Sequence, residues 1–139
     1  MKKLSVYCFM LLVGISVSSF KSVQQTTTVY IYATVTSADV KATAFSDIFR
    51  ITVEKSSAYN ESSEKHSAAK KMENNFKKYM YINESWDKYV STGSAWADSR
   101  SELEEKRLKA MESEKRRGYK VTSSLFSFSY SAGDAYRNY

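Results

Sequence analysis

The chain has 139 residues, a formal charge of +6 and 42% hydrophobic residues, which is enough for one folded domain with its own core. Its single cysteine, Cys8, excludes an intramolecular disulfide, so stability must come from packing. The basic residues are mostly interleaved with acids, whereas a nucleic-acid-binding protein gathers them on one face, so nucleic acid is not expected as a partner.

The N-terminus is typical of a cleavable secretory signal peptide. Lys2 and Lys3 precede an apolar run from residue 4 to residue 17, and small residues then offer a cleavage site before Phe20. A membrane anchor is the alternative, but a spanning helix needs roughly 20 apolar residues and this run is shorter. Cys8 lies inside the run and not after it, which argues against lipidation.

Cleavage at this point divides the chain into a signal peptide, residues 1–19, and a single domain, residues 20–139. The loss of two lysines lowers the formal charge of the mature chain from +6 to +4. We therefore expect an exported protein, periplasmic or secreted, with no stable membrane anchor after cleavage.

Two strands are expected first. Residues 27–36 alternate, with Val29 and Ile31 on one face and Tyr30 and Tyr32 on the other. A second alternating run over residues 45–54 predicts a strand that is hairpin-paired to the first.

A long amphipathic helix is expected next. Its apolar positions recur at three- and four-residue spacing, and they are Ala68, Ala69, Met72, Phe76, Tyr79 and Met80. Asn60 or Ser62 is expected to cap its start, and the segment 91–94, which contains Gly93, to end it. The pattern leaves open whether residues 83–85 divide this helix.

A second helix is delimited most clearly. Ser99 and Glu102 have the spacing of a capping box, and Gly118 follows a basic last turn, as is typical of a helix end. Residues 119–130 predict a third strand with a bulge near Ser123, and residues 131–139 a loose tail. The order strand, strand, helix, helix, strand predicts an α+β domain: a small antiparallel sheet with the helical pair packed on one face.

Catalytic, cofactor and metal motifs are not found in the sequence. His66 is the only histidine and has no metal-ligating or catalytic partner at a fixed spacing, so we interpret it as a surface residue. Glu104 and Glu105 are adjacent on a helix and point about 100° apart, so they do not converge on one substrate atom. No cofactor is expected, and the chain is not expected to be an enzyme.

Acids four residues before a base predict exposed helical ion pairs at Glu73 and Lys77, Glu102 and Lys106, and Glu112 and Arg116. These pairs favour a solvated helix face over a polyanion site.

Three functional hypotheses follow, and the first is a non-catalytic exported module that binds a protein or envelope component through its sheet face or helix surface. Tyr30 and Tyr32 would serve it if their rings were exposed, although aromatic residues are also common in strands for packing alone. The second hypothesis is a polyanion or envelope-surface binder that uses the basic residues Lys70, Lys71, Lys77, Lys78, Arg116 and Arg117. The third is a hydrolase with two convergent acids in a pocket.

Overall fold

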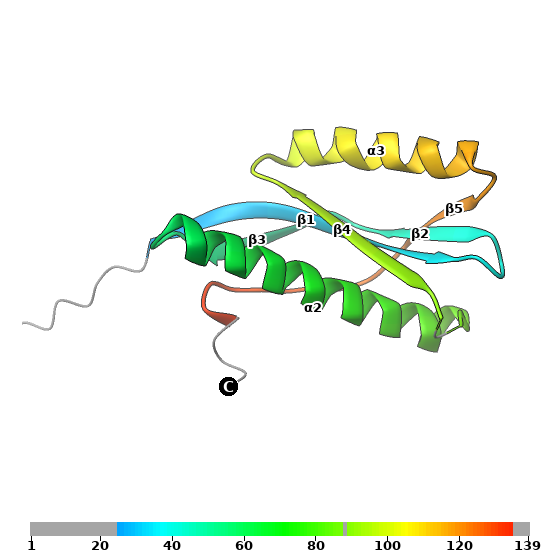
Figure 1. Ribbon diagram of the computed structural model, residues 1–139, viewed down its shortest axis with the longest axis horizontal. Coiled ribbons are helices and arrows are strands. Elements are labelled where there is room, and N and C mark those ends of the chain that lie inside the picture. Colours follow the sequence, from blue (N-terminus) through cyan, green and yellow to red (C-terminus); the bar gives the residue numbers. More distant parts are fainter. Residues whose placement is uncertain (1–24, 88, 135–139) are drawn as a thin grey trace, which may run out of the picture.

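The sheet is built around one long strand, β1 (Thr26–Ser37). The computed structural model describes residues 25–87 and 89–134 (Figure 1). β2 (Ala42–Ser46) and β3 (Phe49–Glu54) pair antiparallel with successive parts of the same edge of β1. The predicted signal peptide and its cleavage site lie outside the described residues.

Two further strands complete the sheet. β4 (Ser91–Ala97) pairs antiparallel with the opposite edge of β1, and β5 (Lys120–Ser124) pairs in parallel with β2. The sheet is therefore mixed and five-stranded, so the expected α+β class is confirmed but the antiparallel sheet is wrong. The expected order is also wrong, because β4 lies between the two helices.

The predicted second strand is two strands separated by a β-bulge. Thr34 pairs with Phe45 and Ile31 pairs with Phe49. Between these pairs, the three residues 46–48 lie opposite only two residues of β1, 32 and 33. The Ser46 hydroxyl accepts the Ala33 N–H at 2.9 Å, which satisfies a backbone donor at the irregularity.

The two helices, α2 (Ala58–Glu84) and α3 (Arg100–Arg116), cover opposite faces of the sheet (Figure 1). The expectation that both pack on one face is therefore wrong. The cause is the alternation of β1: Val29 and Ile31 contact the α2 layer, while Tyr30 and Tyr32 contact the α3 layer. Both sides of the strand are apolar enough to need a cover.

α2 has the predicted buried stripe, which includes Ala68, Met72, Phe76 and Met80. The Ser57 hydroxyl caps its start, one turn earlier than expected. The helix ends before Ser85, whose backbone is left-handed with φ of 55°. The expected end at residues 91–94 is therefore wrong, and the helix stops at the segment 83–85 that the pattern left open.

β4 was not predicted, because the segment was interpreted as a helix end. Its sequence is mostly serine, alanine and Gly93, which carry little strand signal, and only Thr92 and Trp96 favour a strand. Small side chains are needed here, since a Cβ at Gly93 would lie 3.0 Å from the Thr34 hydroxyl on β1. A tertiary contact therefore determines this strand.

α3 begins where predicted, with the Ser99 hydroxyl accepting the Glu102 N–H at 3.3 Å. Arg107 fastens the helix to the sheet: its Nε donates to the Ser46 carbonyl at 3.0 Å, and its guanidinium lies over the Phe45 ring. Leu103 is the fully buried residue of this helix, so α3 covers its face less completely than α2 covers the other.

The C-terminal segment after β5 crosses the α2 face and does not extend the strand. Phe126, Phe128 and Tyr130 pack against Phe49 and α2. Residues 131–134 are also held, so they do not form the expected loose tail; residues 135–139 lie outside the described part. Burial of the apolar side chains explains this path.

The buried carboxylate of Glu64 joins this segment to the sheet. It lies on α2 and accepts the backbone N–H groups of Glu54 and Gly133, so it links the end of β3 to the C-terminal segment. Charge-assisted hydrogen bonds of this kind explain why a fully buried acid is tolerated.

Candidate functional site

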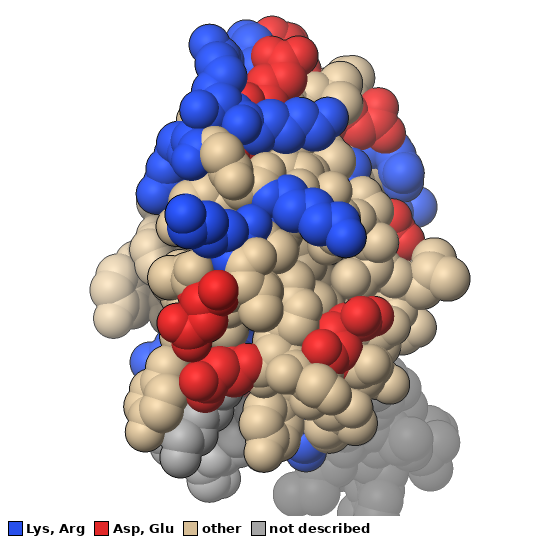
Figure 2. Space-filling model, turned by 90° about the vertical axis from the view of Figure 1, so that its right-hand side faces the viewer, with Lys and Arg blue, Asp and Glu red and all other residues tan. Residues whose placement is uncertain are grey.

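Basic side chains gather at the end of the molecule where α3 finishes. Lys115, Arg116 and Arg117 come from the last turn and C-cap of α3. Lys41 precedes β2 and Lys120 begins β5, and the Lys120 N–H donates to the Lys41 carbonyl at 2.8 Å. Several lysine and arginine side chains gather in the upper half of the surface in Figure 2, where α3 ends, with a few acidic side chains beside them. We call these five residues the basic end.

Most cations of the basic end have no acidic partner within the described part of the chain, whereas several cations earlier on α3 form ion pairs. Earlier in the helix, Arg100 pairs with Glu104, Lys106 with Glu102 and Lys109 with Glu105, at 2.5–2.8 Å. At the basic end, Arg117 pairs with Glu114 at 2.6 Å. Within residues 25–87 and 89–134, no acid lies within ion-pair distance of the other four, Lys41, Lys115, Arg116 and Lys120, so their charge is available to an anion.

The predicted ion pairs are present in part. Glu102 and Lys106 are paired at 2.6 Å, as expected. The Glu73 carboxylate instead accepts the hydroxyls of Thr92 and Ser94 on β4. The predicted pairing of Arg116 is not found among the described residues, which leaves this cation at the basic end.

The six basic residues predicted to bind a polyanion do not form one surface. Lys70, Lys71, Lys77 and Lys78 lie on α2, on the opposite side of the sheet from the end of α3. Lys71 lies 3.8 Å from Asp134 and 5.5 Å from the Tyr130 ring centroid, so it contributes to the C-terminal packing. Arg116 and Arg117 instead lie in the basic end with Lys41 and Lys120, two residues that were not predicted to bind a polyanion.

The two predicted tyrosines lie under α3. Tyr32 is 4% exposed, and the centroid of its ring lies 6.0 Å from that of the Phe45 ring. Tyr30 is half-buried and belongs to the same cluster, which includes Leu103. The burial of these two residues agrees with the interpretation that they serve packing, and their rings do not form an exposed patch.

Burial raises the pKa of the Tyr32 hydroxyl above its ordinary value of 10.0, and the positive charge of Arg107 opposes this shift. As the pH rises above about 10, the unfolded chain ionises this group first, so stability falls until the folded form ionises as well. We expect Tyr32→Phe to lose less stability than the wild type between mildly and strongly alkaline pH in urea unfolding. The exposed Tyr59→Phe is the control and should behave as the wild type; an unchanged alkaline loss in Tyr32→Phe would contradict the assignment.

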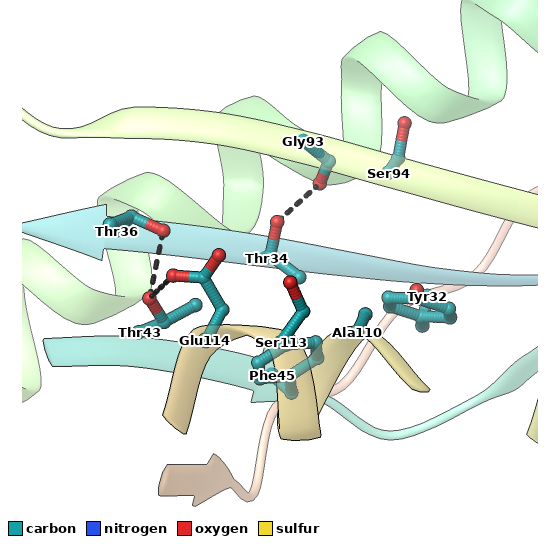
Figure 3. Close-up of a pocket in the computed structure, with 10 residues that line it drawn as sticks. All are labelled: Tyr32, Thr34, Thr36, Thr43, Phe45, Gly93, Ser94, Ala110, Ser113 and Glu114. Carbon is teal, nitrogen blue, oxygen red and sulfur yellow. Dashed lines mark hydrogen bonds between the residues drawn. The ribbon is translucent and has the colours of Figure 1, made fainter. Parts of the chain in front are cut away.

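A groove lies between the last turns of α3 and the sheet (Figure 3). Its volume is about 270 Å³. The strands supply Tyr32, Thr34, Thr36, Thr43, Phe45, Gly93 and Ser94, and the helix supplies Ala110, Ser113 and Glu114. Most of these side chains carry an oxygen that can form hydrogen bonds.

Hydrogen bonds link the floor of the groove to the basic end. The Thr36 and Thr43 hydroxyls lie 3.0 Å apart, and Thr43 donates to Glu114 Oε2 at 2.9 Å. The other oxygen of Glu114 binds Arg117, so the carboxylate stands between the groove and the cations. Most of the groove residues were not predicted, because they come from β1, β2, β4 and α3, and the packing of these elements depends on contacts between residues far apart in the sequence.

The hydrolase hypothesis required two acids in one pocket. The groove under α3 contains Glu114, a second groove between α2 and β5 contains Glu84, and a third beside Trp96 contains Glu61. Each of these grooves is therefore lined by one acid, and none supports that hypothesis.

Within the described ranges, no group of three or more potential metal ligands is found. The same ranges contain no helix that is long and apolar enough to cross a membrane. His66 lies on the surface of α2, where its ring contacts Trp96 and its Nδ1 lies 2.9 Å from the Ser62 carbonyl.

No family model, curated protein or solved structure matches this chain.

Proposed function

We propose that this protein is exported and acts as a non-catalytic interaction module that binds an anionic polymer of the cell envelope through the basic end. The signal-peptide pattern supports export. The observation that carries the binding proposal is a group of four cations, Lys41, Lys115, Arg116 and Lys120, that have no acidic partner in the described part of the chain. They come from α3, from β5 and from the turn before β2. Fixed like charges at one place repel each other and favour an anionic partner.

The structure favours this hypothesis over binding through a sheet face. Each face of the sheet is covered by a helix, and Tyr32 is buried under one of them. The basic end, in contrast, has exposed side chains at each of its five positions. A cation close to an anionic surface contributes about 1 kcal/mol of binding free energy.

A triple variant, Lys41→Asn, Arg116→Ala and Lys120→Ala, tests the proposal. Asparagine is chosen for Lys41 because that residue has φ of 45°, which asparagine tolerates. With about 1 kcal/mol lost for each cation, the affinity for inorganic polyphosphate is expected to fall about a hundredfold at low salt. The affinity of the wild type should itself fall steeply as salt rises.

The control removes the same charge from α2 through Lys70→Ala, Lys77→Ala and Lys78→Ala. This variant should keep most of the affinity, because the basic end is intact. Equal losses in the two variants would show that net charge alone determines binding, and wild-type affinity in the first variant would exclude the basic end.

A further inference from the structure

The groove under α3 has the acceptor oxygens that a polyhydroxylated ligand needs. Thr34, Thr36 and Thr43 place three hydroxyl groups on its floor (Figure 3). These hydroxyls already bond to the Gly93 carbonyl, to each other and to Glu114, and each oxygen can still accept a hydrogen bond from a ligand. Ser113 and the carboxylate of Glu114 line the helix side. A hydrocarbon ligand would exclude water from these acceptor oxygens and donate nothing to them, so the groove favours a ligand that donates several hydrogen bonds, as one with several hydroxyl groups does.

Two aromatic residues form the base of the groove. The rings of Tyr32 and Phe45 lie beside each other, with centroids 6.0 Å apart, and both line the groove. Tyr32 is 4% exposed and Phe45 is 1% exposed, so only a small part of each ring reaches the groove. The oxygens that line the groove therefore determine the class of ligand, and a sugar ring carries hydroxyl groups around its edge that can donate to them.

The size of the groove limits the ligand to about one ring. Its 270 Å³ lies just below the roughly 300 Å³ at which pockets for drug-sized ligands begin. Small residues keep this space open, since Ala110 faces the sheet from α3 and Gly93 has no side chain.

The charges around the groove favour a ligand whose anionic groups lie outside the groove. Glu114 lines the groove and would repel a ligand anion there, whereas its other oxygen binds Arg117 at the basic end. We propose that the groove binds one uncharged sugar ring of an anionic glycan whose acidic groups contact the basic end. This inference rests on the proposed function and specifies the class of polymer.

The test compares three kinds of ligand by calorimetry. The first kind is a panel of acidic oligosaccharides, uronate, sulfated and phosphate-linked, each with its neutral counterpart. The second is inorganic polyphosphate, and the third is a vesicle of anionic phospholipid. Two groove variants are used: Ala110→Leu, which fills the space, and Thr43→Val, which keeps the shape and removes a hydroxyl. Leu108→Ala, on the exposed side of α3, is the control, and thermal unfolding checks that each variant folds.

We expect at least one acidic oligosaccharide to bind more tightly than its neutral counterpart, and Ala110→Leu and Thr43→Val to weaken it about tenfold. Polyphosphate, which needs the basic end alone, should bind these variants as it binds the wild type. If no oligosaccharide is affected by the groove variants, or if only the vesicle and polyphosphate bind, the sugar site is wrong and the basic end stands. If none of the anionic ligands binds, the proposed function fails as well.

Discussion

Replacing Phe76 with alanine is expected to lower the free energy of unfolding by about 4 kcal/mol, because large core truncations lose both burial and packing. Phe76 is fully buried on α2, and its ring lies 5.1 Å from that of Phe126 and 6.3 Å from that of Tyr79. The substitution therefore loosens the attachment of the C-terminal segment as well as the α2 layer. Urea unfolding followed by circular dichroism measures the change.

The control for this prediction is Ile82→Ala on the same helix. Ile82 is 63% exposed, so its truncation should change stability by no more than about 0.5 kcal/mol. Similar losses in the two variants would show that Phe76 is not at the centre of the core.

Replacing Glu64 with alanine is expected to cost about 3 kcal/mol. The substitution leaves the N–H groups of Glu54 and Gly133 without their acceptor, and hydrogen bonds to charged groups contribute about 1.5–3 kcal/mol each. Hydrogen exchange should also accelerate at these two amides, because the bonds that protect them are lost. Chemical denaturation and amide exchange together test both consequences.

Two further variants distinguish the loss of these hydrogen bonds from the removal of any acidic side chain. Glu64→Gln keeps one acceptor oxygen and should retain part of the stability. Glu61→Ala removes only a partly exposed pair with Lys65, which is worth less than about 1 kcal/mol. If Glu64→Ala is no less stable than Glu61→Ala, the carboxylate does not hold the C-terminal segment.

Local signals predicted both helices, the apolar stripe of α2 and the start of α3, but not the two ends of α2. The apolar stripe of α2 and the Ser99 cap of α3 depend on residues close together in the sequence, and both are present. The first strand was also placed within one residue at each end. These features follow from periodicity and capping, which a single sequence contains.

Long-range pairing was not predicted. The parallel pairing of β5 with β2 joins residues almost eighty positions apart, and no turn sequence specifies it. β4 is determined by its fit beside β1 and under α3, not by its own propensity. The basic end and the groove both depend on these pairings. For that reason the sequence indicated Arg116 and Arg117 but not Lys41, Lys120 or Thr43.

The most direct test of the central proposal is an amide chemical-shift titration of the protein with inorganic polyphosphate at low salt. Saturable shifts should be largest at Lys41, at residues 115–117 and at Lys120, and they should disappear when salt is raised. Shifts that are largest along α2, at residues 70–78, or the absence of saturable shifts, would contradict the assignment of anion binding to the basic end.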